Sequence, residues 1–245
     1  MKGNLEPPPY KAQAQYPQIC CITLNETDKL RLIGTPPELI PLLRDAIKTS
    51  WGAIQRERNY NGSFEFKMLG NPWYGQGADS VKSRRLIVSV LKTMVQHGWE
   101  LIQAADVSKK NTDKDSLFFE YIEQSTEMVD TGEIDMFAVS FNRYDRLRII
   151  DGPARIIPTV REAIQQQWRS GIQEEQIYFS AMEFKLHGYP FFADGQEAVM
   201  SRMMLSQILA NVKAQGYRLY TSVDISIGHE GADAETWVFR AVRPA

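Results

Sequence analysis

The chain has 245 residues, of which 43% are hydrophobic and 24% are charged, and its formal net charge is −2. This is ordinary globular composition, with enough apolar material for one large domain or two small ones. No long polybasic stretch is present, so we expect neither a nucleic-acid partner nor an anionic membrane partner.

The same composition indicates a cytoplasmic location. The longest apolar runs are too short to span a bilayer, and the first residues contain no apolar segment typical of a signal peptide. The two cysteines, Cys20 and Cys21, are adjacent, and a disulfide between neighbouring residues is strained. We therefore expect two free thiols, which are typical of a reducing compartment.

Residues 1–17 form a proline-rich arm that contains the stretch "EPPPY", Glu6 to Tyr10. Consecutive prolines exclude a helix or a central strand and favour a polyproline II conformation. Pro7, Pro8 and Tyr10 resemble the P-P-x-Y ligands of WW domains. The resemblance implies that the two prolines fill an aromatic groove and the tyrosine a second pocket. A solvated leader is the alternative, and the sequence leaves both open.

After the arm, alternating and helical hydrophobic patterns define a series of elements. A proline is accepted at the first position of a helix, so we expect the first helix to begin at Pro41. The predicted elements are strands at 19–24 and 29–33, a helix at 41–51, a strand at 63–69, a helix at 79–96 and a hairpin of strands at 99–107 and 116–121.

These elements are written twice, about 117 to 120 residues apart. "DKLRLI" at 28–33 recurs as "DRLRII" at 145–150, and "GWELIQAADVS" at 98–108 recurs as "GYRLYTSVDIS" at 216–226. A repeat of this length is a whole domain rather than a solenoid unit. The predicted domains are an arm at 1–17, repeat 1 at 18–121, an acidic linker at 122–136 and repeat 2 at 137–245.

Each copy therefore reads β-β-α-β-α-β-β. Strands joined mainly by hairpins predict a mostly antiparallel sheet with both helices on one face, which is an α+β fold. Two linked copies of one domain are expected to associate as an intramolecular pseudo-dimer with approximate two-fold symmetry.

Three pairs of equivalent positions keep the same residue type in both copies and are candidate ligand-binding residues. They are Trp73 and Phe191, Arg84 and Arg202, and Asp106 and Asp224. The structural explanation is a turn plugged by an aromatic ring and an ion pair that belongs to the architecture. The functional explanation is a rigid aromatic loop beside an arginine that binds a carboxylate or a phosphate. In that case each repeat has one concavity, and divergence leaves only one repeat fully competent.

Catalytic and metal-binding patterns are scarce. The histidines, His97, His187 and His229, do not recur at equivalent positions, and neither H-x-x-x-H nor C-x-x-C occurs. There is no G-x-S-x-G, and the glycines of "GQG" at 75–77 lack the lysine of a phosphate loop. We predict no catalytic residue, metal ligand or cofactor.

Three functions remain open. The first is a non-enzymatic binding protein that recognises a small molecule or a protein partner through pseudo-symmetric aromatic loops. The second is an adaptor whose arm recruits WW-domain proteins, and it is compatible with the first. The third is an enzyme with a site between the repeats, and it ranks last because no catalytic motif supports it.

Overall fold

The computed structural model describes residues 18–107, 114–123, 134–225 and 235–242. The arm with Pro7, Pro8 and Tyr10 and the histidine His229 lie outside the described residues, as does most of the linker.

Both copies fold into the same series of elements. The first contains β1 (Ile19–Asn25), β2 (Lys29–Ile33), α1 (Leu39–Ser50), β3 (Ile54–Tyr60), β4 (Ser63–Met68), the short helix η1 (Pro72–Tyr74), α2 (Ala78–Gln96), β5 (Trp99–Ala105) and β6 (Ser116–Tyr121). The second contains β7 (Met136–Asn142), β8 (Arg146–Ile150), α3 (Ile156–Gln167), β9 (Ile172–Tyr178), β10 (Ala181–Leu186), α4 (Gly195–Ala214), β11 (Tyr217–Val223) and β12 (Thr236–Ala241).

Two details differ from the prediction. Each copy has one strand more than expected, β3 and β9, because these strands lie at a sheet edge and "IQRERNY" at 54–60 has no apolar alternation. Helix α1 begins at Leu39 rather than at Pro41. Pro41 is tolerated in the first turn because the first four N–H groups of a helix have no partner inside the helix.

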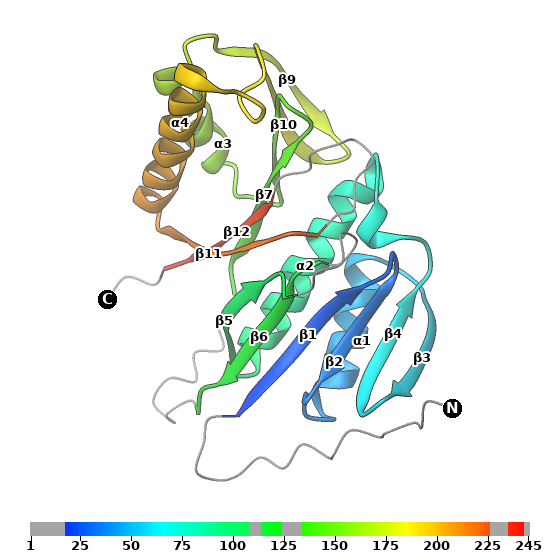
Figure 1. Ribbon diagram of the computed structural model, residues 1–245. Coiled ribbons are helices and arrows are strands. Elements are labelled where there is room, and N and C mark those ends of the chain that lie inside the picture. Colours follow the sequence, from blue (N-terminus) through cyan, green and yellow to red (C-terminus); the bar gives the residue numbers. More distant parts are fainter. Residues whose placement is uncertain (1–17, 108–113, 124–133, 226–234, 243–245) are drawn as a thin grey trace.

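Each copy forms one six-stranded antiparallel sheet (Figure 1). The strand order is β3-β4-β2-β1-β6-β5 in the first sheet and β9-β10-β8-β7-β12-β11 in the second. Equivalent strands therefore occupy equivalent places, which confirms the predicted duplication of an antiparallel α+β unit. Strands β5 and β11 each close one edge of their sheet.

The core of each repeat lies between its sheet and its two helices. In the first repeat, Ile22 and Leu24 of β1 point to the same face because side chains alternate along a strand, and Leu43 and Ile47 of α1 cover them. All four side chains are at most 1% exposed. Helices α3 and α4 cover the second sheet in the same way.

The contact that α2 makes with the second repeat is not reciprocal. The opposite face of the second sheet packs on α2, which contacts β7 and β8, so α2 lies against two sheets at once (Figure 1). Ala138, Ile150 and Val238 of this face are at most 1% exposed and share one apolar cluster with α2. The cluster around α4 contains only residues of the second repeat.

The two copies thus associate, but head to tail: the helix layer of the first repeat meets the sheet of the second. This corrects the expected two-fold symmetry, which requires each copy to use the same surface. Two copies in one chain need not be related by symmetry, because each copy has different neighbours along the chain. In the described part of the chain, no helix is long and apolar enough to cross a bilayer.

Candidate functional site

A cavity of about 620 Å³ lies between the repeats, at the edge strands β5 and β11. The two strands contact each other, although they belong to different sheets and to equivalent places in the two copies. The volume is within the range of small-molecule sites in proteins. The head-to-tail packing therefore creates one shared cavity that neither repeat forms by itself.

Both edge strands carry a bulge beside this cavity. The register of β5 shifts between Leu101 and Gln103, and that of β11 shifts between Leu219 and Thr221. Bulges are common at sheet edges and next to functional sites, because they bend the strand and end its pairing. The same irregularity at the same place in both copies indicates a feature of the domain rather than an accident of one repeat.

The hydroxyl of Tyr220, in the bulge of β11, ties the two edges together. It accepts a hydrogen bond from the backbone N–H of Leu101 at 2.9 Å and donates one to Glu100 at 3.2 Å. Arg240 pairs with the same Glu100 carboxylate at 2.7 Å. Burial raises the pKa of Tyr220 to about 12, so its phenol stays protonated at neutral pH.

The walls of the cavity are acidic. Asp106, Asp115, Asp224 and Glu235 line it, and among its described lining residues there is no lysine, arginine or histidine. The backbone N–H of Asp224 donates to Asp115 at 2.8 Å. Burial nevertheless raises the pKa of Asp115, and the nearby charges of Asp224, Glu235 and Asp106 raise it further. The neighbouring carboxylates therefore disfavour ionisation of Asp115, and a bound cation offsets that effect.

These carboxylates are not arranged as a metal centre. Within the described ranges, no three histidine, cysteine, aspartate or glutamate side chains come together in a way that can hold a metal ion. The remaining walls contain aliphatic side chains, among them Ile102 and Ala104. Acidic groups beside apolar wall suit an organic cation, whose charged end and hydrocarbon part both find a matching surface.

The aromatic candidates have structural roles. Trp73 is fully buried, and its indole N–H donates to the carbonyl oxygen of Lys29 at 2.8 Å. Phe191 is half-buried and packs edge to face against Phe141. The loop that carries Trp73 follows Gly70, whose φ of 85° favours glycine. The turn-and-plug explanation therefore describes both loops.

The two arginine candidates differ completely in surroundings. Arg84 of α2 is 1% exposed and donates to the carbonyl oxygen of Ser80 at 3.1 Å and to the Thr236 hydroxyl of the other repeat at 3.3 Å. Arg202 of α4 is exposed and reaches the hydroxyl of Ser201 at 3.3 Å. Neither arginine lines the acidic cavity.

The six candidates therefore do not line one concavity per repeat. Only Asp106 and Asp224 meet, and they do so in the cavity shared by the two copies. The expectation was wrong because it treated each repeat as a separate unit, whereas the site forms at the edges that the repeats bring together. The sequence patterns did not single out Asp115 or Glu235, although both copies have an acidic residue before the last strand, in "DSLFFEY" at 115–121 and in "ETWVFRA" at 235–241.

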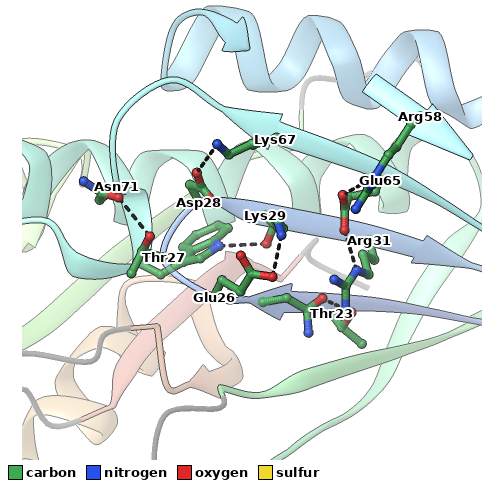
Figure 2. A network of polar contacts seen from close by, with 12 residues as sticks. Thr23, Glu26, Thr27, Asp28, Lys29, Arg31, Arg58, Glu65, Lys67 and Asn71 are labelled. Carbon is green, nitrogen blue, oxygen red and sulfur yellow. Dashed lines mark hydrogen bonds and ion pairs between the residues drawn. The ribbon is translucent and has the colours of Figure 1, made fainter. Parts of the chain in front are cut away.

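A second polar cluster lies on the free face of the first sheet (Figure 2). Glu65 accepts hydrogen bonds from Arg31 at 2.7 Å and from Arg58 at 2.8 Å. Burial raises the pKa of Glu65, but the two arginine bonds outweigh it, so the net pKa is lowered. Beside it, Lys67 pairs with Asp28 at 3.5 Å. Because each charged side chain of this cluster has a partner of opposite charge, it is a structural network rather than a reactive site.

Comparison with known proteins finds one domain twice in the chain. One protein-family model matches the chain twice, over residues 18–120 and 135–240. Together the two matches cover most of the 245 residues, and each contains one complete sheet with its two helices. No curated protein and no solved structure shows significant similarity to the chain.

Proposed function

We propose that this chain, which belongs to the family that the domain model defines and carries the domain twice, is a non-enzymatic binding protein that recognises an ammonium or guanidinium group between its repeats. The observation that carries the proposal is the meeting of Asp106 and Asp224 in one cavity, together with Asp115 and Glu235. The ligand is a small molecule with such a group or the basic side chain of a peptide.

Electrostatics favours a cation at this place. Carboxylates that share a cavity repel one another, and partial burial strengthens the repulsion because water screens it less. A bound cation offsets the repulsion and favours the ionised form of Asp115. Binding therefore releases protons near the raised pKa of Asp115, and affinity falls as the pH falls.

The recognition surface is the edge-strand cavity rather than the aromatic loops, whose rings Trp73 and Phe191 pack into the protein. The free thiols of the buried Cys20 and the half-buried Cys21 support a cytoplasmic location, since oxidising compartments favour disulfides.

The test is isothermal titration calorimetry of the full chain with Nα-acetyl-arginine amide. Nα-acetyl-citrulline amide, which has nearly the same shape without the charge, is the matched ligand control. We expect binding of the arginine ligand only. Asp106→Asn combined with Asp224→Asn weakens it about tenfold or more, since hydrogen bonds to charged groups are worth about 1.5–3 kcal/mol. The control variant Glu162→Gln, an exposed carboxylate on α3, leaves it unchanged.

Two results contradict the proposal. One is equal binding of the citrulline ligand, because then charge is not recognised. The other is unchanged binding by the double variant, because then the cation sits elsewhere. A peptide with one arginine in an extended sequence, measured beside the small ligand, separates a peptide site from a small-molecule site.

A second candidate function rests on the "PPPY" sequence at 7–10. Prolines already in the polyproline II shape lose little entropy on docking, so a peptide of residues 5–16 is expected to bind P-P-x-Y-selective WW domains in the micromolar range, about −8 kcal/mol. Fluorescence polarisation with Pro8→Ala and Tyr10→Ala peptides tests it. Loss with both variants supports docking, and absence of binding by the parent peptide or by the full chain contradicts it.

A further inference from the structure

The outer face of α4 is exposed, although the equivalent face of α2 is covered. In α2, Val81 and Val88 are 1% and 7% exposed because the second sheet packs on them. In α4, Val199, equivalent to Val81, is 61% exposed, and Met203 one turn further is 51% exposed. A groove of about 760 Å³ runs along this face of α4.

The surface that covers α2 has a counterpart elsewhere on the molecule. In the second sheet, the covering side chains include Met136, Ala138, Ile150 and Val238. The equivalent side chains on the free face of the first sheet are Ile19, Cys21, Ile33 and Phe118. Every one of these positions is again apolar or a thiol, and Ile33 is 43% exposed. The first sheet therefore keeps the pattern that binds a helix face, but no helix of the described chain lies on it.

The charged pair that joins the two repeats has no equivalent on α4 or on the first sheet. Between the repeats, Arg85 of α2 forms a two-pronged pair with Asp151, with both bonds at 2.7 Å. The residue equivalent to Arg85 is Met203, and the residue equivalent to Asp151 is Gly34. Both charges of the pair are thus missing together, so a contact between α4 and a first sheet leaves no unpaired charge at this position.

Another hydrogen bond between the repeats has residues of the same types at the equivalent positions. Arg84 donates to the Thr236 hydroxyl across the repeats, and the equivalent residues are Arg202 and Ser116, an arginine and a hydroxyl again. The α4 face is more polar than that of α2 toward its end, where Ser206 replaces Val88. Contact at α4 is accordingly weaker than the contact inside the chain.

We propose that a second copy of this chain docks the free face of its first sheet onto α4 and so repeats between molecules the head-to-tail contact that joins the two repeats. The two surfaces are different patches of one chain, so the contact is heterologous and leaves one α4 face and one sheet face open at the ends of each assembly. The contact continues an interface that already exists within the molecule. We expect micromolar self-association of the full chain.

The test is sedimentation velocity of the full chain over a range of concentrations. Met203→Glu changes only the α4 face, and Ile33→Glu changes only the sheet face. Each variant alone weakens self-association about tenfold or more, since an unpaired charge enters the contact. Mixing them restores one contact between the intact sheet face of the first and the intact α4 face of the second, so the mixture forms a 1:1 dimer and nothing larger.

Ile177→Glu is the matched control, because Ile177 is 69% exposed on β9 and belongs to neither surface. Its self-association equals that of the parent chain, and thermal melts of all three variants show that they are folded. A chain that stays monomeric overturns the proposal. So does a mixture of the two variants that stays monomeric, and so does loss of association with Ile33→Glu while Met203→Glu has no effect.

Discussion

Arg84 and Arg202 are arginines at equivalent positions of α2 and α4, and they differ in what covers them. Arg84 is buried under the second sheet and bonded across the repeats, whereas Arg202 is exposed. Replacing each by alanine therefore measures the contribution of the repeat contact at this position. We expect Arg84→Ala to destabilise the protein and Arg202→Ala to change stability by less than about 0.5 kcal/mol.

The expected cost of Arg84→Ala follows from its contacts. Truncation removes two buried methylenes, worth about 0.8 kcal/mol each. It also removes bonds to Thr236 and Ser80, worth about 1 kcal/mol each after exchange with water. Relief of the buried charge offsets part of this sum, so the net loss is about 2 to 3 kcal/mol. Arg84→Met retains most of the apolar stem and recovers about half of the loss.

Urea unfolding at neutral pH, followed by circular dichroism, provides the measurement. The midpoint of Arg84→Ala falls while its slope with denaturant stays that of the parent chain, because the surface exposed on unfolding is unchanged. Equal midpoints for Arg84→Ala and Arg202→Ala would refute the reasoning, because burial of α2 by the second sheet would then contribute nothing at this residue.

Two further predictions concern side chains inside the fold. Trp73→Ala costs about 3–5 kcal/mol in urea unfolding because it empties a closed core site. Phe191→Ala, at the half-buried equivalent, costs less, and the reverse order would contradict the packing. Asp115→Asn raises the melting temperature at neutral pH, since the raised pKa makes the charged form of Asp115 unfavourable in the folded state. This gain fades as the pH falls through the raised pKa of Asp115 and is gone below about 3.9, the ordinary carboxyl pKa, so a gain that persists there contradicts the assignment.

The duplication and most elements were predictable because they rest on local patterns. Phe66 and Met68 alternate with charged residues and both lie in the core, as the period of a strand requires. Strand β3 was not predictable, because an edge strand with mostly exposed side chains needs no apolar alternation. Its place follows from pairing with β4, which is a tertiary contact.

The arrangement of the repeats and the site could be predicted only in part. Val81 and Val88 make α2 apolar on the side that faces away from its own sheet. In α4, Ser206 stands at the position equivalent to Val88. That contrast signals a second covering surface but does not identify it. Asp106 and Asp224 were found because both copies retain them, yet their meeting depends on how two edge strands approach each other.

The position of α2 against two sheets makes the order of synthesis matter. The first repeat leaves the ribosome before the second, so its sheet and helices can pack while the outer side of α2, with Val81 and Val88, still faces water. Only when β7, β8 and β12 have emerged is that side covered. During this interval the nascent chain exposes an apolar helix face, and transiently exposed apolar surface favours aggregation. The time needed to translate residues 122–135 therefore adds to the time during which this side of α2 is exposed. Codons that slow the translation of this stretch lengthen that exposure.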